Sequence, residues 1–191
     1  IKRLVKGVQV DAEKCGPKRG QNFINSAKGE GLRSTDVDAK DYFYKRMQEI
    51  YAAYEVQCQR EGVVDFSELL LRAYEVLKAN EALRAHYQAR FSHILIDEFQ
   101  DTNSLQYAWL KLLASPQTVM MAVADDDQSI YAFRGAKVEN MRDFEREFAQ
   151  NNVIKLEQNY RSYGHILNAA NALIKQNANR LGKNLWTDRG H

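Results

Sequence analysis

The chain has 191 residues, and 45% of them are hydrophobic, which is ample for a packed core and excludes a disordered protein. Its net charge of +2 neither requires nor excludes a nucleic-acid partner. No apolar run of about 18 residues and no signal-peptide pattern occurs, so we expect a cytoplasmic protein without a membrane partner.

The sequence begins Ile1-Lys2-Arg3 without an initiator methionine, and we expect the chain to be a piece of something longer. Its two cysteines, Cys15 and Cys58, form no C-x-x-C pair, and its four histidines are scattered. This pattern predicts neither a structural metal nor a disulfide, as is usual in a reducing compartment.

The first ninety or so residues are predicted to be all-helical. Pro17 is typical of the first turn of a helix, which Gly29 and Gly31 would end. Apolar residues at spacings of three and four then predict one long helix from Asp36 to Arg60, ended by Gly62. The apolar stripe of this helix consists of Phe43, Met47, Ile50, Tyr51, Tyr54 and Cys58.

A further helix is predicted from Asp65, which stands three residues before Glu68 as in a capping box. Its apolar face consists of Leu69, Leu70, Ala73, Tyr74 and Leu77. These segments together predict a small helical bundle.

After Phe91, short apolar runs alternate with amphipathic segments, a pattern that favours β-α-β structure. The predicted strands are His93 to Ile96, Val119 to Ala124 and Val153 to Leu156. The predicted helices are Ser104 to Ala114, Lys137 to Phe148 and His165 to Ala178. We expect a parallel sheet whose strands are buried on both faces by helices, with ligands bound beyond the carboxyl ends of the strands.

The first predicted strand ends in two adjacent carboxylates, Asp97 and Glu98, which is the Walker B arrangement. Such a pair is suited to Mg²⁺: Asp97 would hold the ion through its water shell, which leaves Glu98 free to orient and deprotonate an attacking water. The alternative is a solvated acidic turn before a helix cap at Thr102 or Asn103.

The second predicted strand leads into three consecutive aspartates, two aromatic residues and an arginine. Gln128 can donate a hydrogen bond to a γ-phosphate. Tyr131 or Phe133 offers a flat face for a nucleic-acid base, a contact worth about 1 to 3 kcal/mol for any sequence. The alternative is that both aromatics belong to the core.

The third predicted strand is followed by Tyr160 and Arg161. Arg161 can reach a transferring phosphate as an arginine finger, because its guanidinium matches phosphate oxygens. Tyr160 can stack on a nucleobase. The alternative is a surface tyrosine and arginine at the start of a helix.

The three segments together resemble motifs II, III and IV of the UvrD/PcrA/Rep group of superfamily 1 DNA helicases. The matching stretches are Asp97-Glu98-Phe99-Gln100-Asp101, Asp125 to Tyr131 with Phe133-Arg134-Gly135-Ala136, and Gln158-Asn159-Tyr160-Arg161-Ser162. The resemblance extends to Val64 to Leu70 and Arg180 to Thr187, and so covers nearly the whole chain.

This resemblance implies an ATP-dependent 3′-to-5′ DNA helicase and translocase that acts in DNA repair, with ATP and Mg²⁺ as cofactors. Asp97 and Glu98 would serve the metal, Glu98 would be the catalytic base, and Gln128 and Arg161 would contact the γ-phosphate. Tyr160 would stack on adenine. The single-strand track would contain Tyr131, Phe133 and Arg134. The implied partners are single-stranded DNA, duplex–single-strand junctions and other repair proteins.

The implied fold is α/β, with part of a RecA-like P-loop NTPase sheet preceded by an all-helical subdomain. We expect a partial helical insertion at residues 1–90, the second part of a first motor domain at 91–155, and the start of a second at 156–191. The 191 residues contain no G-x-x-x-x-G-K-[ST] loop, so we expect them not to hydrolyse ATP alone. Two alternatives are a non-catalytic single-strand-binding module and a piece of a related helicase-nuclease subunit.

Overall fold

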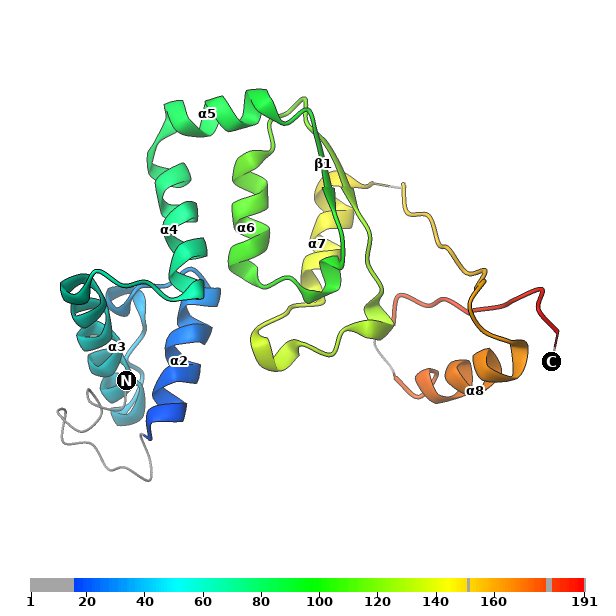
Figure 1. The fold of residues 1–191 in the computed structure, drawn as a ribbon, viewed down its shortest axis with the longest axis horizontal. Coiled ribbons are helices and arrows are strands. Elements are labelled where there is room, and N and C mark those ends of the chain that lie inside the picture. Colours follow the sequence, from blue (N-terminus) through cyan, green and yellow to red (C-terminus); the bar gives the residue numbers. More distant parts are fainter. Residues whose placement is uncertain (1–15, 151, 178–179, 191) are drawn as a thin grey trace.

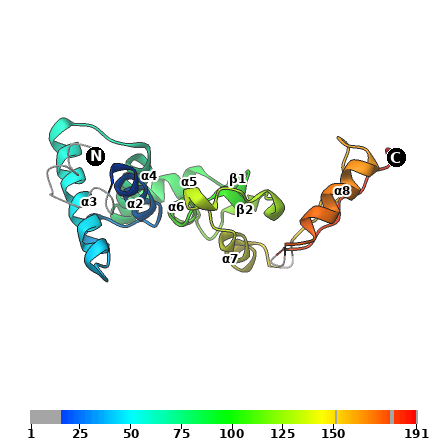
Figure 2. The ribbon, with the colours of Figure 1, turned by 90° about the horizontal axis from the view of Figure 1, so that it is seen from below.

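The computed structural model describes residues 16–150, 152–177 and 180–190 (Figure 1). The described chain is elongated: helices α2 to α4 lie at one end, two strands with α5, α6 and α7 lie in the middle, and α8 lies at the other end (Figure 2). Cys15 lies outside the described residues. Within the described part, no helix is long and apolar enough to cross a membrane.

The helical end begins with α2 (Pro17–Gly29), which carries Pro17 in its first turn as predicted. The long helix α3 (Tyr42–Glu61) starts later than the predicted Asp36, because the Asp41 side chain accepts a hydrogen bond from the Tyr44 amide and caps it there. Gly62 ends this helix as predicted, with a φ of 64° that favours glycine.

The predicted apolar stripe of α3 does form the core of this end. Met47, Ile50 and Tyr51 are fully buried, and Ile24 of α2 packs in the same region. Cys58 is a free thiol and is only half-buried.

Two further helices, α4 (Phe66–Ala79) and α5 (Glu81–Arg90), connect the helical end to the sheet. Asp65 caps α4 as predicted, and Asn80 separates the two helices by capping α5. Gln88 of α5 donates to the carbonyls of Leu112 and Ala114, which fixes α5 to the end of α6.

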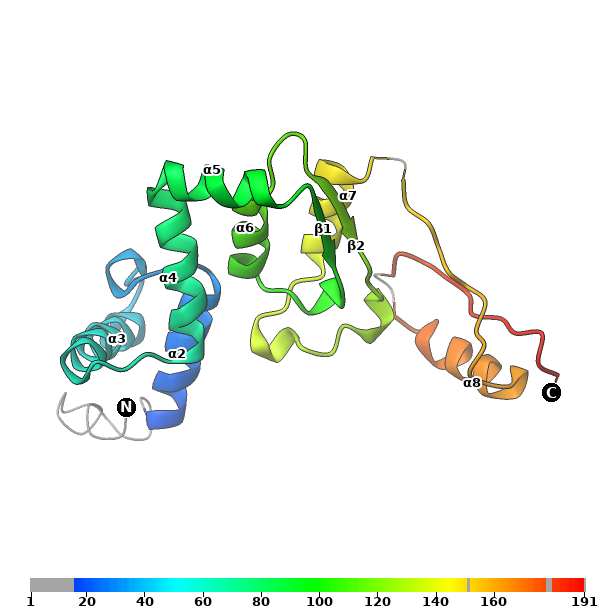
Figure 3. The ribbon, with the colours of Figure 1, turned by 45° about the horizontal axis from the view of Figure 1, so that its top comes forward.

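The sheet consists of β1 (His93–Ile96) and β2 (Val119–Ala122), which pair in parallel with His93 opposite Val119 and Ile96 opposite Ala122. Helices α6 (Ser104–Leu113) and α7 (Glu139–Phe148) pack on one face of it (Figure 3). The buried aromatics of this layer are Phe99, Tyr107 and Phe144. The prediction of a parallel sheet is confirmed for these two strands.

The prediction that the strands are buried on both faces is wrong. Leu95 is 73% exposed, and Met121 on the same face is also exposed, because no helix of the described residues covers that side. The strand predicted at Val153 to Leu156 is also wrong: these residues pair with no strand of the described chain, and without a partner an extended segment gains no ladder hydrogen bonds.

The last helix, α8 (Gly164–Ile174), ends earlier than predicted, and Ala178 lies outside the described residues. A single parallel bridge between Gln158 and Trp186 holds the segment before α8 to the segment after it.

Candidate functional site

Asp97 and Glu98 lie in the turn that leaves β1, and both side chains are exposed. Glu98 has a φ of 50°, in the left-handed region, and is the one non-glycine residue with positive φ in the described chain. A bulky side chain in this conformation carries strain, which is common at functional sites. The Glu98 amide donates to Oδ1 of Asp97 at 3.0 Å. The other Asp97 oxygen accepts no hydrogen bond from the described residues.

The alternative of an acidic turn before a helix cap accounts for part of this segment. Asn103 does cap α6, because its side chain accepts from the Gln106 amide at 2.8 Å. The cap lies five residues beyond Glu98, and no hydrogen bond of the described residues joins Asn103 to Glu98.

Gln100 is a residue of this site that the sequence analysis missed. It sits in a short 3-10 turn after Glu98 and is only 1% exposed. Its Nε2 donates to Oε2 of Glu98 at 2.6 Å, and its Oε1 accepts from the Asp125 amide at 3.0 Å. The signal that could have found Gln100 is its position directly after Phe99, an aromatic residue that is itself buried. A turn that lies wholly on the surface does not bury a phenylalanine and a glutamine side by side.

The turn after β2 brings Gln128 to the same edge of the sheet. Gln128 Nε2 donates to Oδ2 of Asp125 at 2.6 Å, and the Asp127 amide donates to Oδ1 of Asp125 at 3.0 Å. Burial on its own raises the pKa of the Asp125 carboxyl, but the hydrogen bonds from Lys183 and Gln128 outweigh it and lower that pKa. Asp125 is therefore an ionised acceptor that holds the Gln128 amide.

The three aspartates that follow β2 lie with their carboxylates within 4.8 Å of one another. Their acceptors are occupied by the segment after α8: Arg180 binds Asp127 through two hydrogen bonds of 2.6 and 2.7 Å, and the Leu181 amide donates to Asp126 at 2.6 Å. Lys183 forms an ion pair with Asp125. Two of the three negative charges are therefore paired with cations of the same chain, and Asp126 is held by a neutral backbone amide. These contacts were not predicted from the sequence.

Tyr131, Phe133 and Arg134 form an exposed aromatic and cationic surface beyond β2. The rings of Tyr131 and Phe133 are 5.9 Å apart, and the Arg134 guanidinium lies 4.7 Å and 5.4 Å from their centres. Phe133 is 78% exposed and Tyr131 is half-buried, so the alternative of two core aromatics is wrong for Phe133.

Tyr160 and Arg161 lie in the turn before α8, and both are exposed. The Asn159 side chain accepts hydrogen bonds from the Arg161 and Ser162 amides, which shapes this turn. No hydrogen bond or ion pair of the described residues joins Tyr160 or Arg161 to Asp97, Glu98 or Gln128. The structure thus brings two of the three predicted segments together and leaves the third apart (Figure 1).

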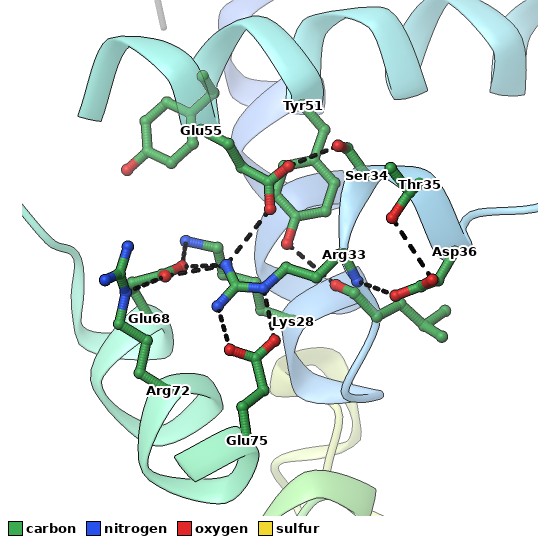
Figure 4. Close-up of polar contacts among 12 residues, drawn as sticks. Lys28, Arg33, Ser34, Thr35, Asp36, Tyr51, Glu55, Glu68, Arg72 and Glu75 are labelled. Atoms are coloured by element: carbon green, nitrogen blue, oxygen red, sulfur yellow. Dashed lines mark hydrogen bonds and ion pairs between the residues drawn. The ribbon is translucent and has the colours of Figure 1, made fainter. Parts of the chain in front are cut away.

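A second polar cluster lies in the helical end, where Lys28 and Arg33 meet four acidic side chains. Figure 4 labels Glu55, Glu68 and Glu75 among them. Lys28, nearly fully buried, forms ion pairs of 2.8 Å with both Asp65 and Glu68. Arg33 binds Glu75 through two bonds of 2.6 Å, and it also reaches Glu68 at 2.9 Å and Glu55 at 3.3 Å. The cluster ties α2, α3 and α4 together.

The charge state of Glu68 follows from these partners. Burial on its own raises the pKa of Glu68, but hydrogen bonds from Lys28, Arg72 and Arg33 outweigh it and bring that pKa down to about 2. A cavity of about 370 Å³ opens beside the cluster, away from the strand ends. Because the charged groups of the cluster already bind one another, this second site is structural.

The acidic turn after β1, the glutamine turn after β2 and the parallel sheet that joins them are features of an α/β helicase domain. Residues 1–149 match the family model described as the UvrD/REP helicase N-terminal domain, and the chain belongs to this family.

Individual relatives are similar over almost the whole chain. DNA helicase II of Escherichia coli K12 is 49% identical over 98% of this chain, and the probable DNA helicase II homolog of Rickettsia conorii is 42% identical over 99%. The ATP-dependent DNA helicase PcrA of Staphylococcus aureus NCTC 8325 is 39% identical over 98%. The chain spans 26%, 29% and 26% of the length of these relatives.

Proposed function

We propose that the protein containing this chain is an ATP-dependent DNA helicase that translocates 3′ to 5′ and acts in DNA repair. The observation that carries the proposal is the shared sheet edge at which Asp97, Glu98 and Gln128 meet, in a chain of the UvrD/REP family. Ligands of parallel α/β sheets bind at this edge. The chain would supply one wall of the ATP site.

Asp97 is the proposed ligand of Mg²⁺. Its carboxylate is exposed and one oxygen is unbonded within the described chain, which fits an ion that keeps most of its water shell and takes few carboxylates. When bound, the ion would offset the negative charge of the ATP phosphates. The aspartates 125–127 fit the ion less well, since Arg180, Leu181 and Lys183 already engage them.

Glu98 is the proposed catalytic base and Gln128 the proposed γ-phosphate contact. Oε2 of Glu98 accepts the Gln100 hydrogen bond, and Oε1 accepts none from the described residues. Oε1 is therefore the atom that would take a proton from the attacking water. Gln128 would exchange its bond to Asp125 for one to the phosphate.

Arg161 and Tyr160 are proposed to complete the site from a second motor domain, with Arg161 on the γ-phosphate and Tyr160 on the adenine. Their exposure fits groups that await a ligand. We propose the domain division 1–90, 91–155 and 156–191, which agrees with the end of α5 at Arg90 and the start of β1 at His93.

The surface of Tyr131, Phe133 and Arg134 is the proposed contact with single-stranded DNA. Replacing Phe133 with alanine is expected to weaken binding of an oligothymidylate about 5-fold to 100-fold, the equivalent of one lost base–aromatic stack. Fluorescence anisotropy titrations of the full-length protein measure this. The control is Phe66→Ala, because Phe66 is a phenylalanine of the helical end that is even more exposed than Phe133. Equal affinity for Phe133→Ala and wild type would contradict the stacking role.

The 191 residues alone are expected to release no phosphate from ATP above the background rate, with or without DNA, because they contain no G-x-x-x-x-G-K-[ST] loop to cradle the phosphates. A malachite-green assay of the purified chain measures this. Phosphate release that Glu98→Gln abolishes would overturn the expectation.

The proposed function is tested on the full-length protein with tailed duplexes. A 3′-to-5′ helicase separates a duplex with a 3′ single-stranded tail when ATP and Mg²⁺ are present, and it leaves a 5′-tailed duplex paired. Protein that binds single strands without separating either duplex would instead be the non-catalytic binding module, a function that the exposed Phe133 also fits.

A further inference from the structure

Gln100 lies between the two strand ends that the proposed function uses, and its orientation is fixed by its partners. The group opposite its Oε1 is the backbone amide of Asp125, which can only donate a hydrogen bond. The amide nitrogen of Gln100 then faces Glu98 and donates to its carboxylate oxygen Oε2. Exchange of the two side-chain atoms would put donor against donor and acceptor against acceptor.

The same side chain reaches Gln128 through one further residue. Asp125, whose amide binds Gln100, accepts the Gln128 side chain on Oδ2. A continuous series of hydrogen bonds therefore runs from Glu98 through Gln100 and Asp125 to Gln128. At its far side, Asp125 is also paired with Lys183.

Among the described residues, Gln100 is the one hydrogen-bond partner of the Glu98 side chain. The backbone of Glu98 is in the left-handed region, and its side chain is exposed. The buried Gln100 side chain holds Oε2 of Glu98 in place through its hydrogen bond. Oε1 of Glu98 accepts no hydrogen bond from the described residues. A base of this kind works only when its free oxygen is held within a fraction of an ångström of the productive position.

We infer that Gln100 is a positioning residue for ATP hydrolysis: it holds the Glu98 carboxylate and links it to Gln128, so that the base and the γ-phosphate contact move as a unit. The inference rests on the proposed function, since it requires that Glu98 be the base. Gln100 itself is buried, so its effect passes through Glu98.

The experiment measures DNA-stimulated ATP hydrolysis by the full-length protein that contains these residues. Gln100→Met keeps the length of the side chain and removes both hydrogen bonds. It is expected to lower kcat about 10-fold to 100-fold and to change the KM for ATP by less than about threefold, as for a misplaced catalytic group.

Gln100→Glu is the second variant, and it keeps an acceptor for the Asp125 amide while placing a carboxylate oxygen against Glu98. It tests the Glu98 contact without the loss of the Asp125 contact, and its kcat is expected to fall at least as far as that of Gln100→Met. Gln117→Glu is the matched control, because Gln117 is exposed and stands before the amino-terminal end of β2, whereas Gln100 follows the carboxyl end of β1. Its kcat is expected to equal that of wild type.

A double-mutant cycle with Glu98→Gln separates positioning from a general structural effect. If Gln100 acts through Glu98, adding Gln100→Met to Glu98→Gln lowers the residual kcat by less than about threefold, because the group it positions is already gone. The inference is overturned if Gln100→Met lowers the kcat of the Glu98→Gln variant by as large a factor as it lowers the kcat of wild type. It is also overturned if the kcat of Gln100→Glu stays within about threefold of wild type.

Failure of the proposed function has a different signature. If Glu98→Gln alone hydrolyses ATP at the wild-type rate, Glu98 is not the base, and the proposed function and the inference fail together. If Glu98→Gln is inactive while both Gln100 variants keep the wild-type kcat, the proposed function stands and only the role of Gln100 fails.

Discussion

Replacing Glu98 with glutamine in the full-length protein is expected to lower the kcat of DNA-stimulated ATP hydrolysis by about 100-fold to 10,000-fold, the usual contribution of a general base. Glutamine has the size of glutamate and keeps an oxygen for the Gln100 hydrogen bond, so the turn after β1 is preserved. Only the ability to take a proton from water is lost. The affinity for ATP and Mg²⁺ is expected to stay within about threefold of wild type, because Asp97 is unchanged.

The measurement compares phosphate release at saturating ATP and single-stranded DNA with the binding of a fluorescent ATP analogue. Glu81→Gln serves as the matched control, since Glu81 is an exposed glutamate at the start of α5, the helix that precedes β1. A Glu98→Gln variant that binds the analogue and keeps the wild-type kcat would exclude Glu98 as the base.

Replacing Glu68 with glutamine is expected to lower the free energy of unfolding of the helical end by about 3 to 5 kcal/mol, the usual result of removing one partner from a buried ion pair. Glu68 binds Lys28 and Arg33 at once, and Lys28 is almost fully buried, so the substitution leaves a buried positive charge undercompensated. Urea unfolding followed by circular dichroism measures the change. The matched control is Glu61→Gln, because Glu61 is exposed at the end of α3.

The stabilisation by Glu68 also depends on pH, and its sign follows from the lowered pKa. The pKa of Glu68 is about 2 in the folded chain against an ordinary value of 4.5. The stabilisation is therefore fully present above about pH 4.5 and is lost as the pH falls through about 2. Asp65, whose pKa is also lowered, contributes with the same sign. Glu68→Gln is expected to show a shallower loss of stability over this range, and an equally steep loss would contradict the role of Glu68.

Local signals in the sequence predicted much of the fold. Pro17 and Asp65 mark the starts of α2 and α4, and Gly62 marks the end of α3, because each satisfies a backbone requirement within its own turn. The limits of β1 also match the prediction. By contrast, the strand expected at Val153 to Leu156 failed, since a strand depends on a partner that its own sequence does not contain.

For the site, the sequence indicated which residues follow the strands but not how they contact one another. The parallel-strand rule placed Glu98 and Gln128 at one sheet edge, and the structure agrees. The bridge through Gln100 and the pairing of Arg180 with Asp127 join residues from distant segments, and no periodicity or local motif encodes such contacts. The roles of these residues in catalysis remain predictions.

The most direct test of the ATP-dependent helicase proposal is strand separation by the full-length protein and its Glu98→Gln variant on a 3′-tailed duplex. The wild-type protein is expected to separate the strands only when ATP and Mg²⁺ are present, and the variant is expected to leave them paired while still binding the tail. Equal strand separation by both proteins, or separation that needs no ATP, would contradict the assignment of the acidic end of β1 to ATP hydrolysis.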